Sequence, residues 1–398
     1  MASGIKYSNA NYEITEWLGE IRLKKNGKVI LKTKNNKFMK TYKIIWICSL
    51  FMGILLIGIS CKKNEDNLEN PKPTEKKKYA WACGKPDSTN FGLILFSEDG
   101  GDTWVRQGTG NLSLLEIEII DIWAIDENTV WAIGSDNTVL KTSNTGNSWQ
   151  KVNMPNNPSK PLLQALSIVN KTNIWISGEH GTVYKSTNCG DNWIMFDTIV
   201  FQSNQLQGIF AISPEKVYVA GGTNDSPVRG FIAYTLDGGN TWDNIVPANN
   251  YNKHEWIGVC SSGNTIVVYG RESHYVVSTN GGTTWKNDSV HNTGGGGGAA
   301  DLNHLIMFNS QTWWGAFDMG QIFITHDGGA SWISQLSGQG GFYLIGIDAW
   351  DSQLALSIGT PISHPFESPI LKTSNGGTSW EKKYNYNGFL CKVTFIKD

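Results

Sequence analysis

The sequence has little charge, and arginine is scarce in it. Only 17% of its 398 residues are charged, and its four Arg stand at positions 22, 106, 229 and 271. Residues 79–398 contain 17 Lys and Arg against 28 Asp and Glu, a net charge of −11. Proteins that bind nucleic acid depend on basic side chains to neutralise phosphates. The composition therefore argues against a nucleic-acid partner.

Cysteine motifs typical of zinc and redox sites are also absent. The six Cys, at positions 48, 61, 83, 189, 260 and 391, include no CxxC pair. Structural zinc sites and thiol redox centres depend on such close spacing. We therefore expect no metal and no cofactor.

No apolar run reaches the roughly 20 residues that a membrane-spanning helix needs. The longest, residues 44–59, has 16 uncharged residues and follows a basic stretch that starts at Met39. This pattern is typical of a signal peptide, here residues 39–60. The sequence GISC that follows resembles a bacterial lipobox, in which the cysteine, here Cys61, carries lipid, although Gly58 replaces the usual leucine-like residue. The alternative is an N-terminal anchor helix that is not cleaved.

The lipobox implies a lipoprotein of the outer membrane, on the periplasmic side or at the cell surface, which contacts the membrane through its lipid alone. Residues 61–78 are polar apart from Leu68 and two Pro, and this composition predicts a flexible tether. Residues 1–38 would block a signal peptide behind them, so we interpret them as a spurious upstream extension. Within them, Asn26-Gly27 favours a β-hairpin.

An eight-residue motif recurs seven times and ends on Trp, with spacings of 43 to 49 residues. The pattern is Ser/Thr-x-Asp/Asn-x-Gly-x-Thr/Ser/Asn-Trp. Its third position is Asp99, Asn144, Asn188, Asp237, Asn280, Asp327 or Asn375, and its last is Trp104, Trp149, Trp193, Trp242, Trp285, Trp332 or Trp380. The Asp or Asn can hydrogen-bond its own turn, the Gly can adopt positive φ, and the Trp can pack into a sheet. Four copies have Asn at the third position, which disfavours a calcium loop.

Four short strands accompany each motif, and this predicts an all-β fold: a single seven-bladed β-propeller over residues 79–398. The first copy lacks its opening strand, but residues 390–396 at the other end of the chain have the pattern of one. We therefore predict that they complete blade one and close the ring. Closure would place Cys83 and Cys391 on neighbouring strands, as a disulfide or as two buried thiols.

The repeat resembles the Asp-box, or BNR, repeat of sialidase-like β-propellers. Its strand pattern is most similar to the photosystem II assembly/stability factor-like propellers. This resemblance implies a non-catalytic module that binds a protein partner or an assembly intermediate, and we expect a monomer. The acidic balance departs from the basic binding patch of the photosynthetic members.

The alternative implied by the resemblance is a carbohydrate-binding or sialidase-like glycoside hydrolase surface protein. Sialidases hold a carboxylate with three Arg, whereas only Arg229 and Arg271 are placed to reach the loop face. An enzyme is therefore less expected than a binding protein, and we assign no catalytic residues. A protein and a glycan both remain open as ligands.

Loops of blades four and five supply the candidate ligand-binding residues Arg229, His254, Trp256 and Arg271. Two guanidinium groups beside an aromatic ring suit a carboxylate-bearing or planar ligand. The alternative is that the Arg side chains pair with acids such as Asp225 and Glu272 and that the Trp packs in a core.

Three further polar residues, together with the same Trp256, fall near the starts of first strands. Gln164, Gln207 and His304 are expected there, at the mouth of the central channel.

The first prediction concerns the N-terminus. In a bacterium that processes lipoproteins, mass spectrometry should find a mature protein that begins at lipidated Cys61. Cys61→Ser should move the protein to the soluble fraction because the acyl chains provide the membrane affinity, whereas Cys83→Ser should not. A peptide from residues 1–38 in the mature material would contradict this.

Overall fold

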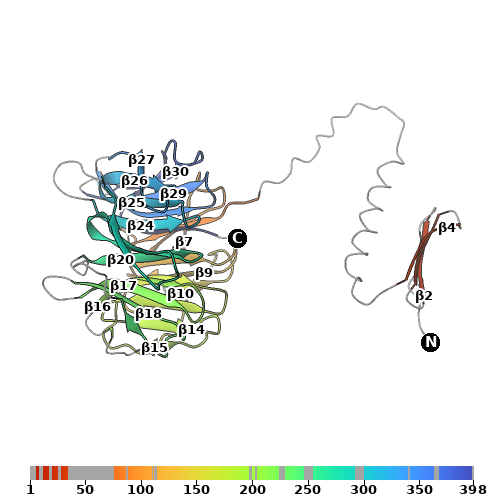
Figure 1. Cartoon of the computed structure of the whole chain (residues 1–398), viewed down its shortest axis with the longest axis horizontal. Helices are drawn as coiled ribbons and strands as arrows, with labels where there is room; N and C mark the ends of the chain where they lie inside the picture. Colours follow the sequence, from red (N-terminus) through yellow and green to blue (C-terminus); the bar gives the residue numbers. More distant parts are fainter. Residues whose placement is uncertain are drawn as a thin grey trace. The chain divides into compact units, whose positions relative to one another are not determined.

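The computed structural model comprises two compact units, Met1–Thr74 and Glu75–Asp398 (Figure 1). In the first unit it describes four strands between residues 6 and 34. In the second it describes residues 76–396 except 87, 110, 112–113, 197–199, 202–203, 224–228, 246–253, 292–299, 339–340 and 363–366. The predicted signal peptide, Cys61 and residues 61–75 of the tether lie outside the described residues. No helix in the described ranges is long and apolar enough to cross a membrane.

The first unit contains an antiparallel sheet with the strand order β1-β2-β3-β4. Its strands are β1 (Lys6–Ser8), β2 (Tyr12–Trp17), β3 (Glu20–Lys25) and β4 (Lys28–Lys34). Strands β3 and β4 pair with Lys25 opposite Lys28, so the two residues between them are Asn26 and Gly27. The predicted hairpin is confirmed.

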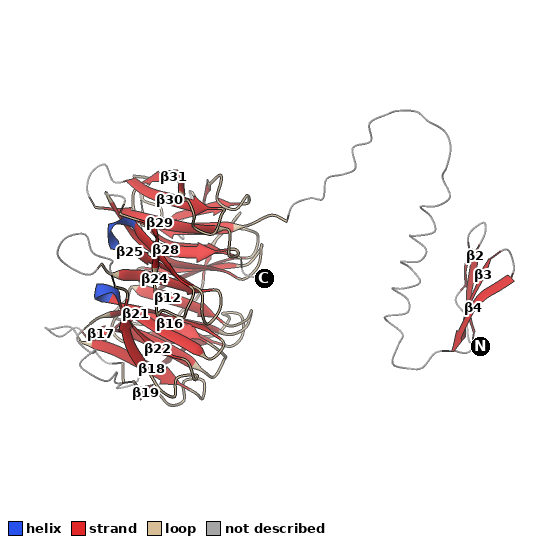
Figure 2. Cartoon of the chain, turned by 45° about the horizontal axis from the view of Figure 1, so that its top comes forward, coloured by secondary structure: helices blue, strands red, loops and turns tan. Residues whose placement is uncertain are grey.

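The second unit is a ring of seven four-stranded antiparallel sheets in the part of the chain that is described (Figure 2). Blade one consists of β32 (Leu390–Phe395), β5 (Ala80–Gly84), β6 (Leu93–Ser97) and β7 (Val105–Gln107). Blade two is β8 (Ile119–Ala124), β9 (Val130–Gly134), β10 (Thr138–Thr142) and β11 (Gln150–Lys151). Blade three is β12 (Leu163–Ile168), β13 (Ile174–Gly178), β14 (Val183–Ser186) and β15 (Ile194–Phe196). Blade four is β16 (Asn204–Ala211), β17 (Val217–Thr223), β18 (Gly230–Thr235) and β19 (Asp243–Asn244).

The last three blades follow the same order, and the 3-10 turns η3 (Arg271–Ser273) and η4 (Asp318–Gly320) join the second and third strands of blades five and six. Blade five is β20 (Trp256–Ser262), β21 (Thr265–Gly270), β22 (His274–Ser278) and β23 (Lys286–Ser289). Blade six is β24 (Leu302–Met307), β25 (Trp313–Phe317), β26 (Gln321–Thr325) and β27 (Ile333–Leu336). Blade seven is β28 (Phe342–Ala349), β29 (Ala355–Pro361), β30 (Glu367–Thr373) and β31 (Glu381–Asn387).

The C-terminal strand closes the ring, as the sequence predicts. Strand β32 pairs antiparallel with β5, with Val393 opposite Ala82. The side chains of Val393 and Phe395 are fully buried. Cys83 lies opposite Lys392 rather than Cys391, and both Cys are free thiols in the structure.

The repeated turn is held by one hydrogen-bond pattern, except that Asn144, Asn280 and Asn375 donate to the hydroxyl that donates to Asp in the copies that have Asp. In the copy at residues 235–242, the Thr235 hydroxyl donates to Asp237 at 2.8 Å and accepts the Gly239 N–H at 2.9 Å. Thr241 donates its N–H and its hydroxyl to the Asp237 carboxylate, and these bonds lower the pKa of Asp237 to about 2. Gly239 has φ of 96°, and a Cβ there would lie 2.5 Å from the Phe196 ring of blade three. The Gly thus serves the turn and the packing between blades.

The second prediction tests ring closure. Deleting residues 389–398 removes β32, which exposes the edge of β5 and the surface that the buried Val393 and Phe395 cover. We expect aggregation or the loss of a cooperative thermal transition, measured by circular dichroism and light scattering. Deleting residues 1–38 is the control, because it leaves the ring intact. A truncated propeller that melts like the full chain would contradict the prediction.

Candidate functional site

A cavity of about 470 Å³ lies on the propeller axis and is lined by the first strands of all seven blades. In each blade, the pairing between the first and second strands skips one residue of the first strand, at the equivalent position. The residues skipped at these β-bulges all line the cavity: Ile120, Gln164, Gln207, Ile257, Asn303, Ile345 and Cys391. A bulge increases the local twist and redirects side chains. The bulges therefore form a ring around the axis, near the start of each first strand.

The second strands accommodate this ring through glycine. Gly134 and Gly221 lie opposite the residues that precede two of the bulges. A Cβ at either Gly would lie 1.8 Å from a backbone oxygen, that of Glu118 just before β8 or that of Gln205 in β16. The absence of a side chain is therefore required at these two positions.

Three titratable side chains meet in the axial cavity. Lys392 Nζ lies 2.7 Å from His304 Nε2 and 3.8 Å from Asp121 Oδ1. Asp121 also accepts the N–H groups of Ile122 and Leu166. Burial raises the pKa of Asp121, and the nearby Lys392 opposes that rise. Lys392 is the one Lys or Arg among the described lining residues, and its side chain is 25% exposed.

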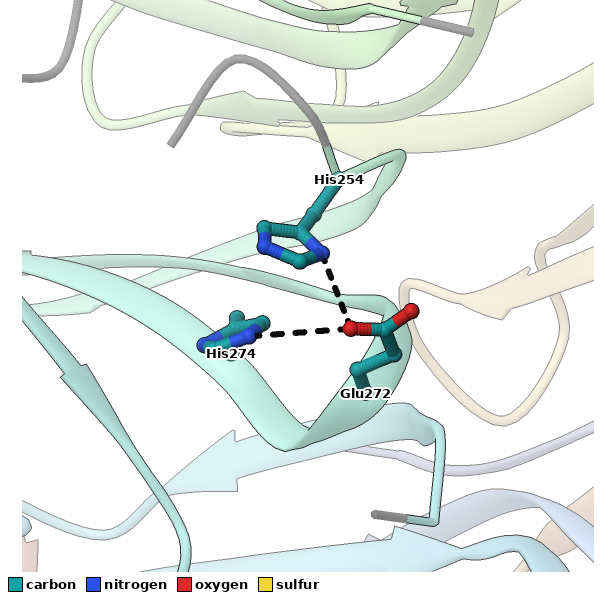
Figure 3. A group of neighbouring side chains, drawn as sticks. All are labelled: His254, Glu272 and His274. Carbon is teal, nitrogen blue, oxygen red and sulfur yellow. Dashed lines mark ion pairs between the residues drawn. The ribbon is translucent and has the colours of Figure 1, made fainter. Parts of the chain in front are cut away.

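A second cluster lies on the loop face of blade five (Figure 3). His254 precedes β20, Glu272 lies in η3, and His274 begins β22. Glu272 Oε2 is 3.3 Å from His254 Nδ1 and 3.9 Å from His274 Nε2. Burial, followed by the charge of His254, lowers the pKa of His274.

Arg271 forms ion pairs within the same face. Its Nε lies 3.1 Å from Glu255 Oε2, and its Nη1 lies 2.6 Å from Asp301 Oδ2. Gln207 donates to the other oxygen of Glu255. The structure thus supports the alternative that Arg271 pairs with acids, although the partners are Glu255 and Asp301 rather than Glu272.

Trp256 packs in a core, which is the alternative to its role as a candidate ligand-binding residue. Its side chain is 0% exposed in a core cluster with Tyr218 and Val259. The reason is the bulge at Ile257, which lines the cavity while the preceding residue packs between blades. The equivalent residues of the other six first strands are all buried Leu or Ile: Ile119, Leu163, Leu206, Leu302, Leu344 and Leu390. That alignment is the sequence signal that identifies Trp256 as a core residue.

The remaining predicted site residues lie on the loop side of the propeller. Arg229 is exposed just before β18, and its N–H donates to the Thr223 hydroxyl at 3.0 Å. Its proposed partner Asp225 lies outside the described residues. Gln164, Gln207 and His304 line the axial cavity, as predicted. Sequence reasoning missed Lys392 and Asp121, because their strands become neighbours of the other first strands only in the closed ring.

Comparisons with known proteins agree with the architecture. The chain matches the family described as photosynthesis system II assembly factor YCF48 over residues 75–200 and 109–293. No curated protein matches it. A structure described as YCF48 bound to D1 peptide is 18% identical, with a TM-score of 0.52, and the match covers 70% of this chain and 92% of that one. YCF48 from Cyanidioschyzon merolae is also 18% identical, with a TM-score of 0.55 and coverage of 76% and 97%.

A WD40 propeller has a comparable likeness. The RRP9 WD40 repeats are 10% identical, with a TM-score of 0.52 and coverage of 78% of this chain and 88% of that one. At such identities the structural likeness is evidence for the propeller fold alone.

The third prediction separates core from surface in the predicted site. Trp256→Ala should lower the free energy of unfolding by about 3–5 kcal/mol, because it leaves a cavity between blades. Arg229→Ala, at an exposed position, should change it by less than about 0.5 kcal/mol. Urea denaturation monitored by circular dichroism measures both. Equal stability of the two variants would contradict the placement of Trp256 in the core.

Proposed function

Since the chain belongs to the photosynthesis system II assembly factor YCF48 family, we propose that it is a non-catalytic binding propeller that holds a segment of another protein. The structure described as YCF48 bound to D1 peptide supports a peptide ligand for this chain as well. The shared feature is the propeller, whose loop face can present several blades to one extended segment.

The single observation that carries the proposal is Lys392 in the axial cavity. It is a partly exposed cation within residues 79–398, which have a net charge of −11. Its ammonium group has three donors, and the neighbouring His304 and Asp121 fix its position. A carboxylate that enters the cavity would form a charge-assisted hydrogen bond with it. We therefore assign the ligand as an extended peptide with a carboxylate, either an acidic side chain or a C-terminus.

The proposed binding surface extends from the cavity over blades four and five. Gln164 at the cavity wall offers an amide that matches peptide groups. Arg229 is exposed just before β18, and the next residue, Gly230, packs directly against the backbone of His254. Arg271 and His254 belong to this surface, whereas Trp256 supports it from the core.

We further propose that Cys61 carries a lipid and that the tether after it holds the propeller away from the membrane. The support is the signal-peptide pattern of residues 39–60 and the polar composition of residues 61–78. A lipid-anchored binding head of this kind would act at the outer membrane, where its partner would also lie.

The fourth prediction tests the peptide ligand. The full chain in detergent is applied to an array of peptides made with free and amidated C-termini, and with Asp and Glu or with Asn and Gln. We expect binding to require a carboxylate, and the matched pairs identify which one. Lys392→Gln should weaken binding to the selected peptides about tenfold or more, since a charge-assisted bond contributes about 1.5–3 kcal/mol.

The matched control is Lys151→Gln, which makes the same charge change at an exposed position on the outer strand β11. Equal binding by the two variants, with unchanged melting, would contradict the role of the cavity. Hydrolysis of a sialoside or a β-glucan by the intact protein would contradict the non-catalytic function itself.

A further inference from the structure

The cluster on blade five has the residue types of a metal site. Two imidazoles and one carboxylate form a common ligand set for zinc and other divalent first-row transition metals. One ligand atom from each of His254, Glu272 and His274 lies within 4.8 Å of the other two. The Glu272 carboxylate points between the two rings (Figure 3). We propose that these three side chains bind a divalent transition metal ion, with Zn²⁺ as the reference ion.

The distances are close to those of a tetrahedral site. Metal–ligand bonds of about 2.0–2.2 Å place neighbouring ligand atoms about 3.3 Å apart. The His254–Glu272 distance is 3.3 Å, and the His274–Glu272 distance is 3.9 Å. The two imidazole rings have centroids 3.9 Å apart. Binding therefore requires the His274 nitrogen to move about half an ångström toward Glu272, and it requires the two imidazole nitrogens, which lie within 4.8 Å of each other, to approach to about 3.3 Å.

The turn that carries Glu272 is held in place from outside the cluster. Glu272 and Ser273 both have positive φ, 56° and 61°, which is uncommon for residues other than Gly. Asp301 accepts the Glu272 N–H at 2.8 Å, and Arg271 connects Asp301 to Glu255. These bonds fix the backbone from which the carboxylate projects. Such outer contacts orient ligands in metal sites.

Blade six provides an internal comparison. Its turn η4 has the same backbone form, with Met319 and Gly320 at φ of 60° and 71°. Met319 and Gln321 occupy the places that Glu272 and His274 have in blade five. The turn is thus shared, whereas the ligand set belongs to blade five. Three protein ligands leave a fourth position for water or for a group of a bound partner.

Isothermal titration of the untagged full chain with Zn²⁺, and Co²⁺ absorption in the visible range, test the site. We expect one metal per chain and a Co²⁺ spectrum of tetrahedral type. His254→Ala, Glu272→Gln and His274→Ala should each weaken Zn²⁺ binding at least tenfold. Even the hydrogen-bond partners of metal ligands contribute 10- to 100-fold to metal affinity, and these three residues are the ligands themselves. His326→Gln, which removes an exposed histidine from the repeated turn of blade six, should leave binding unchanged.

Thermal melting without metal distinguishes loss of the site from loss of the fold. Glu272→Gln keeps the shape of the side chain and should melt like the parent protein. Zn²⁺ affinity unaffected by all three substitutions would overturn the proposal, as would a Co²⁺ spectrum of the aquo ion. The peptide array should also be run once with EDTA and once with Zn²⁺. Peptide binding in EDTA then separates failure of the metal site from failure of the peptide function.

Discussion

The pairing of β32 with β5 is the constraint on which the rest of the propeller depends. It joins the two ends of the repeat array, so that every blade has two neighbours and β5 is not left as an unpaired edge. Asp348 of blade seven reinforces it by accepting the Phe395 N–H at 2.9 Å. Polar side chains elsewhere in the first strands accept the same kind of bond: Asp121 accepts the Leu166 N–H, and Ser167 accepts the Ala211 N–H. Buried hydrogen bonds near the axis thus fix blade two to blade three, blade three to blade four and blade seven to blade one.

Closure also creates the axial cavity and determines its chemistry. Seven bulges at one level bring polar and apolar residues of all blades to the axis, and the position after the bulge is Gly208 in blade four and Gly258 in blade five. Lys392 and His304 hold the same position in blades one and six, and they approach each other to 2.7 Å. A cation held beside a buried carboxylate in a small cavity is a strong recognition group for an anionic ligand. The proposed peptide function depends on this arrangement rather than on the repeated turns.

The repeated turns and the loop face have separate roles. The turns repeat one hydrogen-bond pattern and pack their Gly against the neighbouring blade, so they stabilise the ring. The loop face differs from blade to blade, and the turn of blade five carries the ionisable residues Arg271, Glu272 and His274. There Arg271 is neutralised by Glu255 and Asp301, which leaves the two histidines with Glu272. The charge of Arg271 is thus balanced within the face, and the described residues offer the proposed metal site and the exposed Arg229.

Local sequence was sufficient to predict the repeats, the four strands of each blade, the closing strand and the hairpin at Asn26-Gly27. Most of these follow from periodicity and turn chemistry within about 50 residues. The closing strand follows from a count of strands, because the first repeat lacks its opening strand and the last repeat is followed by one strand too many. It was also sufficient to place Gln164, Gln207 and His304 near the channel mouth.

Tertiary structure alone decided which side chains meet. Asp121, His304 and Lys392 belong to three blades, and His254 is separated from Glu272 by an entire hairpin. The bulge after Trp256 decided its burial, because a shift of one residue turns a strand side chain to the opposite face. Contacts of this kind depend on ring order and on strand register, neither of which is set by the residues of one strand.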